Sequence, residues 1–222
     1  ARLLATTRVA VISGGAMPQF LSQIVTQLPN ETNFNNLYLL PTSGAVLYEY
    51  RNTGWTKVYE ELLTDDESRA IEAAMHESIT ETGVIDLSVP AHGERIEPRG
   101  SQVTLSALGQ QAPLAEKLAW DPDRSKRELL RSAIAKRLPE FSVKIGGKTS
   151  VDVTKVGIDK AYGVRKLCEH IGVPEKDALY VGDELGPGGN YEAVCNTEAK
   201  TQSVKDPVET AHLIEKLLET AS

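Results

Sequence analysis

Hydrophobic positions in the first quarter of the chain follow two different spacings. Residues 9–12 form a short run of β-branched and small apolar side chains, which is typical of a buried parallel strand. Residues 16–28 then place their apolar side chains at helical spacing, and residues 37–50 predict two strands joined by a Pro-Thr-Ser-Gly turn. The order of strand, helix and strand predicts an α/β fold.

The hydrophobic pattern changes in the middle of the chain. Residues 64–83 predict an amphipathic helix with Thr64 as its N-cap and Glu67 completing a capping box. A second helix is predicted to start near Asp121 or Asp123. The remaining pieces of this region have a strand-like pattern, at residues 85–90, 94–100, 101–109, 141–147 and 149–154.

These middle elements predict an α+β insert over residues 56–153, because two helices accompany several antiparallel strands. The chain then returns to an α/β pattern: a helix, a strand, a loop entering a helix and a last helix, at residues 159–173, 178–183, 186–194 and 206–221. We therefore expect a parallel-sheet core, formed by residues 1–55 and 154–222, that the insert interrupts. Ligands of such sheets bind at the carboxyl ends of the strands.

Composition and charge narrow the class of protein. Hydrophobic residues make up 41% and charged residues 25% of the 222 residues, the balance of an ordinary globular protein. The net charge is −7 and the pI about 5.2, and an acidic surface argues against nonspecific nucleic-acid binding. A small anionic substrate stays compatible with this charge, because a local basic pocket can lie on an acidic protein.

The sequence contains no apolar run near the ~20 residues that a membrane span needs. The N-terminal stretch has an alternative interpretation as a signal peptide, but Arg8 interrupts its apolar run. The only cysteines are Cys168 and Cys195, and so few suit a reduced cytosol. We expect a cytoplasmic protein that does not bind a membrane, and the sequence leaves its oligomeric state open.

Ser13, Gly14 and Gly15 follow the first predicted strand and open a helix. The glycines let the backbone approach a ligand, and the helix start offers N–H groups beside the Ser13 hydroxyl, so the segment is a candidate phosphate cradle. The alternative is a tight turn in which Ser13 is the helix N-cap.

Asp183 ends the predicted strand 178–183 and is followed by a loop rich in glycine and proline. A carboxylate at this place suits a hard cation such as Mg²⁺, with Asn190 supporting it through its amide and Glu184 as the nearest second carboxylate. The alternative is that Asp183 is a plain N-cap.

Five other polar positions are weaker candidates when taken one at a time. Lys160 starts a helix, where its charge opposes the helix dipole, and an anionic partner would explain its place; otherwise it is solvated or paired with a neighbouring carboxylate. Arg99 on an insert strand and Lys117 at the edge of a loop are otherwise surface charges. Ser150 and Asp152 alternate along one strand, so they share a face that either meets a ligand or meets solvent.

Taken together and in order, these segments resemble the haloacid dehalogenase-like phosphatases. VISGGA resembles the second motif of that superfamily, Asp159-Lys160 the third, and VGDELGPGGN the fourth, metal-binding motif. An insert of this size between the second and third motifs resembles the large α+β cap of subfamily IIB. IEPRGSQVTLSALG and IGGKTSVDVTKVGIDKAYGVRKL resemble eukaryotic-type phosphomannomutases and their bacterial phosphatase relatives over essentially the whole chain.

This resemblance implies a Rossmann-like core with a cap, and it implies roles for the candidate residues. Ser13 and the following amides would hold the transferring phosphoryl group, Lys160 would neutralise charge, and Asp183 would bind Mg²⁺. The cap contacts to a sugar phosphate would come from Arg99, Lys117, Ser150 and Asp152.

Three departures from the family pattern affect the expected activity. The family has Arg where this chain has Gln110, Arg where it has Lys117, and an acidic residue where it has Tyr191. A mutase holds a sugar bisphosphate by both ends, so the loss of cap arginines favours hydrolysis of a small phosphorylated metabolite. The alternatives are a sugar phosphomutase and an inactive sugar-phosphate-binding module.

The nucleophile of this superfamily lies in an Asp-x-Asp-Gly-Thr segment on the first strand, and the chain has no match to it. The resemblance implies that this strand sits between the strands at residues 9–12 and 178–183. We therefore expect ~20–40 further residues upstream of Ala1, enough for one strand with its loop and partial helix. Direct pairing between those two strands would contradict this expectation.

Overall fold

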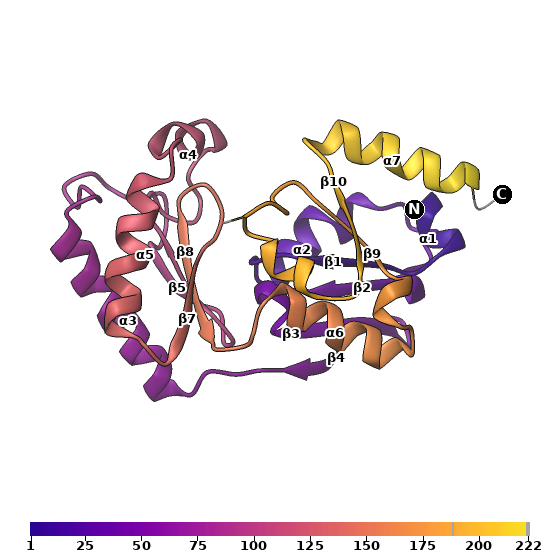
Figure 1. The fold of residues 1–222 in the computed structure, drawn as a ribbon, viewed down its shortest axis with the longest axis horizontal. Coiled ribbons are helices and arrows are strands. Elements are labelled where there is room, and N and C mark those ends of the chain that lie inside the picture. Colours follow the sequence, from indigo (N-terminus) through magenta and orange to yellow (C-terminus); the bar gives the residue numbers. More distant parts are fainter. Residues whose placement is uncertain (188, 221–222) are drawn as a thin grey trace. The chain divides into compact units, whose positions relative to one another are not determined.

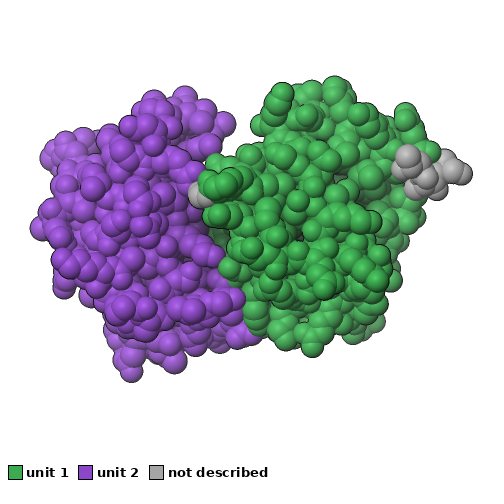
Figure 2. Space-filling model, in the orientation of Figure 1, with its two compact units in different colours: residues 1–60, 159–222 green, residues 61–158 purple. Residues whose placement is uncertain are grey.

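The computed structural model describes residues 1–187 and 189–220, which fold into two compact units (Figures 1 and 2). Unit 1 comprises residues 1–60 and 159–222, and unit 2 comprises residues 61–158. The insert was predicted over residues 56–153, and the structure divides the chain at slightly later positions on both sides. No helix in the described ranges combines the length and apolarity that crossing a bilayer requires.

Unit 1 is the α/β unit that the first and last parts of the sequence predict. Its helices are α1 (Arg2–Thr6), α2 (Met17–Gln23), α6 (Lys160–Ile171) and α7 (Pro207–Thr220). Its strands are β1 (Val9–Ile12), β2 (Leu37–Leu40), β3 (Val46–Arg51), β4 (Gly54–Glu60), β9 (Leu179–Gly182) and β10 (Lys200–Ser203). The parallel pairing of β1 with β2 confirms the predicted α/β class.

The strands of unit 1 form two separate sheets. One has the order β1-β2-β3-β4 and the other pairs β9 with β10 in parallel. Across the described residues, β1 and β9 are not paired with each other, so the pairing that would contradict an intervening strand is not found. Strand β10 was not predicted, because its four residues are all exposed and mostly polar. The last helix ends as predicted apart from Ala221, which lies outside the described residues.

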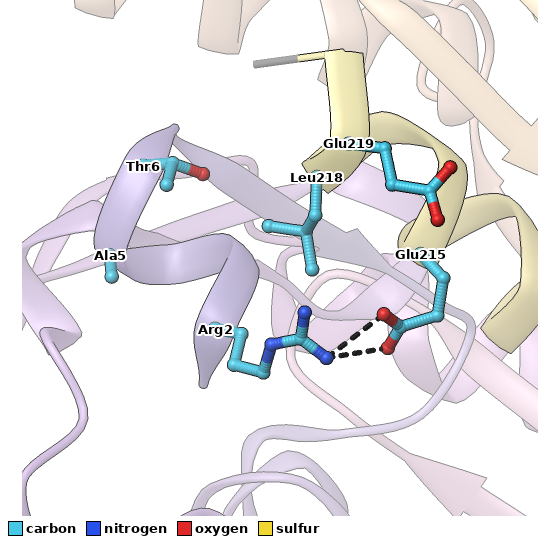
Figure 3. A pocket seen from close by; sticks show the side chains of 6 residues that line it. All are labelled: Arg2, Ala5, Thr6, Glu215, Leu218 and Glu219. Atoms are coloured by element: carbon cyan, nitrogen blue, oxygen red, sulfur yellow. Dashed lines mark hydrogen bonds and ion pairs between the residues drawn. The ribbon is translucent and has the colours of Figure 1, made fainter. Parts of the chain in front are cut away.

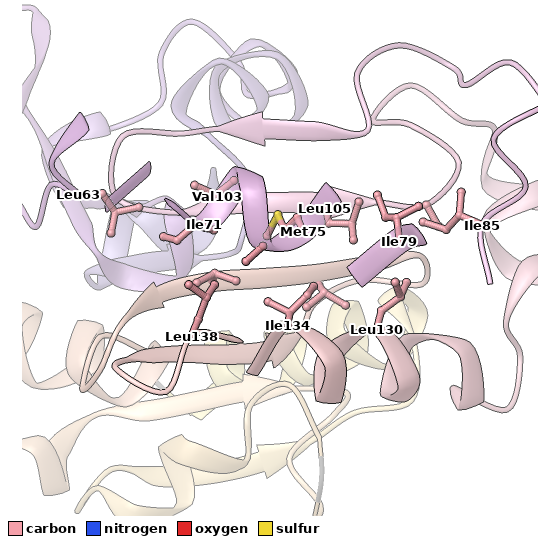
Figure 4. Packing of buried hydrophobic residues seen from close by; sticks show 14 residues of the cluster. Leu63, Ile71, Met75, Ile79, Ile85, Val103, Leu105, Leu130, Ile134 and Leu138 are labelled. Atoms are coloured by element: carbon pink, nitrogen blue, oxygen red, sulfur yellow. The ribbon is translucent and has the colours of Figure 1, made fainter. Parts of the chain in front are cut away.

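Unit 2 is an antiparallel sheet backed by helices, in agreement with the predicted α+β insert. Its elements are α3 (Asp65–Thr82), β5 (Ile96–Pro98), β6 (Val103–Ser106), α4 (Leu114–Trp120), α5 (Ser125–Arg137), β7 (Phe141–Ile145) and β8 (Ser150–Lys155). The strand order is β5-β6-β8-β7. The core lies where α3 and α5 pack on this sheet, with Met75, Leu105 and Ile134 among its fully buried side chains (Figure 4).

The first helix of the insert begins and ends as the sequence predicts. The Glu67 backbone N–H donates to the Thr64 side chain at 3.1 Å, and the Thr64 backbone N–H donates to the Glu67 carboxylate at 2.7 Å. These two bonds form the capping box. Gly83 ends the helix in the left-handed conformation, with φ 60°.

Three predictions about unit 2 were wrong. Residues 85–90 form turns rather than a strand. Lys117 lies in the short helix α4, which the sequence pattern did not reveal, rather than at the edge of a loop. Helix α5 begins at Ser125, because the carboxylates of Asp121 and Asp123 accept hydrogen bonds from the first backbone N–H groups and so cap the helix from outside it.

Candidate functional site

The Ser13 loop lies at the carboxyl end of β1. The Ser13 backbone N–H donates to the carbonyl of Leu40 at 3.2 Å, which extends the pairing of β1 with β2 by one residue. Ser13 is exposed, and its hydroxyl oxygen accepts from the Gly15 N–H at 3.4 Å. Its hydroxyl proton is therefore directed elsewhere, and it can donate to an anion.

Helix α2 starts further along than the sequence suggested. Its N-cap is Ala16 rather than Ser13, and the Ala16 N–H donates to the side chain of Gln19 at 2.9 Å. The alternative in which Ser13 is the N-cap is therefore wrong. The helix is also short, so the hydroxyl and the loop amides, rather than a long helix dipole, are what this segment offers a ligand.

Lys160 is the first residue of α6, as predicted, and it is 3% exposed. Its ammonium group donates to the amide oxygen of Asn190 at 2.8 Å and lies 5.1 Å from the centre of the Tyr191 ring. The side chain of the preceding Asp159 caps the helix by accepting from the Tyr162 N–H. The interpretation of Lys160 as a solvated surface lysine is therefore wrong, and the structure brings it together with the loop after β9.

Glu184 organises the loop after β9. Its backbone carbonyl accepts from the Tyr191 N–H at 3.0 Å, and its carboxylate accepts from the Asn190 N–H at 3.3 Å. A side chain at Gly189 would place its Cβ 2.2 Å from the Glu184 carbonyl oxygen, so the loop closes tightly only around glycine. Gly188, in the same motif, lies outside the described residues.

Tyr191 packs its ring against the end of β9. A Cβ added to Gly182 would lie 2.5 Å from the Tyr191 ring, and the rings of Tyr180 and Tyr191 meet edge to face with centroids 5.9 Å apart. Burial raises the pKa of Tyr191 to about 12, and the negative charges of Asp183 and Glu184 act in the same direction. Burial likewise raises the pKa of Tyr180 above its usual range. Tyr191 therefore stays neutral and presents an aromatic face to the Lys160 ammonium.

The side chains of this loop include the types of ligand that Mg²⁺ prefers. Asp183 and Glu184 supply carboxylate oxygens, and Mg²⁺ is commonly held by one or two carboxylates together with water and substrate phosphate. Within the described ranges there is no group of three or more His, Cys, Asp or Glu side chains that would hold a metal on its own. The Asn190 oxygen, a predicted ligand, accepts from Lys160.

A second polar cluster lies in unit 2 and centres on Gln110. The Arg99 guanidinium, 5% exposed, donates to the Glu97 carboxylate at 2.5 and 2.8 Å and to the Gln110 side-chain oxygen at 3.0 Å. The Lys117 ammonium donates to the Gln110 backbone carbonyl at 3.0 Å. The Gln110 amide nitrogen is buried and has no hydrogen-bond partner among the described residues. Arg99 and Lys117 therefore both bind Gln110, which the sequence identified only as a departure from the family pattern.

Ser150 and Asp152 share a face of β8, as the alternation predicted, while Val151 and Val153 between them are buried in the core. The neighbouring strand β6 continues this polar face, because Thr104 pairs with Asp152 and its hydroxyl donates to the Asp152 carboxylate at 2.8 Å. Sequence reasoning missed Thr104, although the alternation of polar and apolar residues along β6 would have revealed it.

The hollow shown in Figure 3 lies elsewhere in unit 1, between α1 and α7. Arg2, Leu218 and Glu219 are among its lining residues, and Arg2 forms an exposed ion pair with Glu215 at 2.8 Å. None of the predicted site residues lines it.

Known protein families give an independent view of this chain. A family model described as eukaryotic phosphomannomutase matches residues 2–220. The chain is 30% identical over 139 residues to Phosphomannomutase 2 of Dictyostelium discoideum, an alignment that covers 59% of this chain and 55% of that protein. It is 26% identical over 141 residues to a probable phosphomannomutase of Caenorhabditis elegans, covering 60% and 54%. The alignments thus span about half the length of these curated relatives.

Solved structures show a similar fold at low sequence identity. An N-terminally truncated IMP-nucleotidase of Plasmodium falciparum matches with a TM-score of 0.64 and 15% identity, covering 99% of this chain and 62% of that one. A haloacid dehalogenase-like hydrolase of Bacteroides thetaiotaomicron matches with a TM-score of 0.58 and 14% identity, covering 95% and 86%. These structures confirm the predicted fold class, and the family match over residues 2–220 confirms the predicted resemblance to phosphomannomutases.

Proposed function

We propose that this chain, which belongs to the eukaryotic phosphomannomutase family, is part of a Mg²⁺-dependent phosphatase. The enzyme hydrolyses a small phosphorylated metabolite of the sugar phosphate class. Residues at the strand ends of unit 1 would carry out the phosphoryl transfer, and the polar cluster of unit 2 would select the substrate.

The unit 1 residues would bind and neutralise the phosphoryl group. The Ser13 hydroxyl and the adjacent amides would donate to its oxygens, and the Lys160 ammonium would offset its charge. Two contacts already hold this ammonium in place, because Asn190 accepts from it and the Tyr191 ring lies against it. Asp183 and Glu184 would hold Mg²⁺, which when bound polarises a phosphoryl oxygen and neutralises developing charge.

The nucleophile in this proposal is an aspartate on a strand seated between β1 and β9. Its carboxylate oxygen would form a bond to phosphorus while the ester P–O bond breaks, and the departing oxygen takes up a proton. Water would then attack the aspartyl-phosphate, releasing inorganic phosphate and restoring the carboxylate. The sheet orders support this place for the strand, because β1 and β9 each stand at the end of their sheet and so leave an edge to which a further strand could pair.

The single observation that favours hydrolysis is the position of Gln110. Its side-chain oxygen and backbone carbonyl take up hydrogen bonds from Arg99 and Lys117, and Glu97 already balances the Arg99 charge. A mutase must hold the second phosphate of a sugar bisphosphate in its cap, which calls for more positive charge than this cluster offers. A phosphatase needs only to hold the sugar.

A sugar phosphomutase is the second candidate, and family membership favours it. The full-length protein should release phosphate from p-nitrophenyl phosphate and from sugar monophosphates without a bisphosphate activator, and Asp183→Asn should abolish that release. A strict bisphosphate requirement would establish the mutase instead. Full activity of Asp183→Asn would remove the metal assignment, and sugar phosphate binding without turnover would indicate an inactive binding module.

Gln110→Arg gives the sharpest contrast between the two candidates. An arginine at this position adds a bidentate phosphate donor beside Arg99 and Lys117. Under our proposal it should improve the affinity for a sugar bisphosphate by about tenfold and leave hydrolysis of p-nitrophenyl phosphate unchanged. Gln110→Leu, which removes the amide without adding charge, is the matched control. An unchanged bisphosphate affinity in Gln110→Arg would contradict the role given to Gln110.

A further inference from the structure

The turn between β2 and β3 has an unusual backbone. Thr42, Ser43 and Gly44 are consecutive residues with positive φ, at 48°, 59° and 91°. Left-handed backbone is strongly disfavoured for a β-branched residue such as Thr42. Thr42 is also 2% exposed, and its hydroxyl oxygen has no hydrogen-bond partner in the described part of the chain. Such a residue persists only where the surrounding structure fixes it.

One side of this turn is fixed to the Ser13 loop. The Thr42 N–H donates to the Gly15 carbonyl at 2.9 Å, and the Ser43 N–H donates to the Ser13 carbonyl at 2.8 Å. The left-handed conformation directs two consecutive N–H groups at the neighbouring loop. The candidate cradle therefore takes its backbone position from this turn as well as from β1.

The other side of the turn is fixed to helix α6. A Cβ added to Gly163 would lie 2.9 Å from the Gly44 Cα and 2.7 Å from a side-chain carbon of Ile12. The Tyr59 hydroxyl donates to the Gly44 carbonyl at 2.8 Å. Gly163 is three residues after Lys160, in the first turn of the helix, so the turn packs directly on the segment that carries the buried ammonium.

We propose that the left-handed turn Thr42–Gly44 is a positioning element that holds Ser13 and Lys160 in a fixed relation for binding a phosphate group, an inference that rests on the proposed function. Thr42 is buried, so it acts through the backbone and does not touch the anion. A glycine in place of Thr42 would let the turn adopt many more conformations before the anion binds. The entropy lost when the turn becomes ordered on binding would then lower the affinity for the anion.

Two threonine substitutions in the full-length protein test this proposal. Thr42→Gly removes the left-handed strain and the unpartnered hydroxyl. The matched control is Thr53→Gly, in the exposed turn between β3 and β4, where Thr53 is also left-handed with φ 68°. Neither variant should melt at a lower temperature than the wild type. Only Thr42→Gly should weaken the binding of inorganic phosphate, by about tenfold, as measured by titration calorimetry.

A further variant separates backbone restriction from side-chain contact. Thr42→Ser keeps a non-glycine backbone and should bind phosphate within about twofold of the wild type. Three outcomes overturn the inference: unchanged phosphate affinity in Thr42→Gly, a lower melting temperature in that variant, or an equal loss of affinity in Thr42→Ser. If the wild type neither binds phosphate nor hydrolyses p-nitrophenyl phosphate, the proposed function fails first.

Discussion

The two units differ in how completely each builds its own core. Unit 2 has one continuous antiparallel sheet, and its core cluster contains fourteen buried side chains between that sheet and two helices. Unit 1 has two separate sheets, and its described residues include one cluster of four buried side chains, which are Leu4, Phe20, Leu37 and Leu39. Its other buried hydrophobic residues, such as Leu40, Leu47 and Val194, lie outside that cluster. Partly exposed residues such as Val9 and Val11 complete that smaller cluster.

The difference suggests that unit 2 is built for stability and unit 1 for the chemistry of the candidate site. In unit 2 the apolar face of β6 and β8 is filled by α3 and α5, so the insert is held together by packing. In unit 1 the notable contacts are polar: a buried ammonium lies against an amide and a ring, and a left-handed turn is bonded to a loop. Sites that bind ligands are commonly built from such strained and incompletely packed segments.

The largest expected effect is on the core of unit 2. Ile134→Ala deletes a fully buried side chain from the last turn of α5 and should destabilise unit 2 by about 2–5 kcal/mol. Hydrogen exchange read by mass spectrometry would locate this loss of protection in α3, α5, β6 and β8. The matched variant in unit 1 is Leu39→Ala, also fully buried. Its cost should be smaller, because partly exposed neighbours can move into the space.

If Ile134→Ala and Leu39→Ala lower the free energy of unfolding equally, the proposed difference between the two cores is wrong. A loss of protection that spread evenly over both units in Ile134→Ala would contradict it as well. Phosphate binding offers a further check, since Ile134 is placed in packing alone and its substitution should leave the affinity of the remaining folded protein unchanged.

The next effect should be on chemistry without a loss of stability. Lys160→Met keeps an unbranched side chain of nearly the same length and removes the charge that is proposed to neutralise the phosphoryl group. The kcat for p-nitrophenyl phosphate should fall by about 10²–10³-fold, the range for removing one preorganised electrostatic group. The melting temperature should hold or rise, because a buried charge is costly to desolvate. A melting temperature that drops together with kcat would show that Lys160 has a structural role.

Sequence reasoning succeeded where the signal was local. The capping box at Thr64 and Glu67 was readable because its two hydrogen bonds join residues three apart. The start of α6 at Lys160 and the strands that flank the candidate site followed from hydrophobic spacing in the same way.

Long-range contacts explain what the sequence could not reveal. Asn190 was predicted as a metal ligand, and only the fold shows that its oxygen faces Lys160, thirty residues away. Gln110 was identified in the sequence as a departure from the family pattern. Its contact with Lys117 depends on the short helix α4, which has no buried residue and therefore no hydrophobic pattern that would predict it. The turn at Thr42 was predicted, while its left-handed backbone depends on bonds to another loop.

The smallest expected effect is a pH dependence at the start of α3. The Thr64 backbone N–H donates to the Glu67 carboxylate, which holds the pKa of Glu67 below its usual value, and Lys155 at 3.4 Å acts in the same direction. A carboxyl group with a lowered pKa in the folded state adds stability above its unfolded pKa. That stability is lost as the pH falls through the lowered folded pKa.

Glu67→Gln should therefore cost stability most above about pH 5, and the difference from the wild type should shrink as the pH falls toward about 3. Melting curves across this range measure the difference directly. Thr64→Ala is the informative control, because it deletes the side-chain acceptor at the cap but keeps the backbone N–H that lowers the Glu67 pKa. It should cost about 1 kcal/mol and retain the pH dependence. A constant difference between Glu67→Gln and the wild type would mean that the charge of Glu67 does not help to hold the packed unit together, and the contrast between the units would then rest on apolar packing alone.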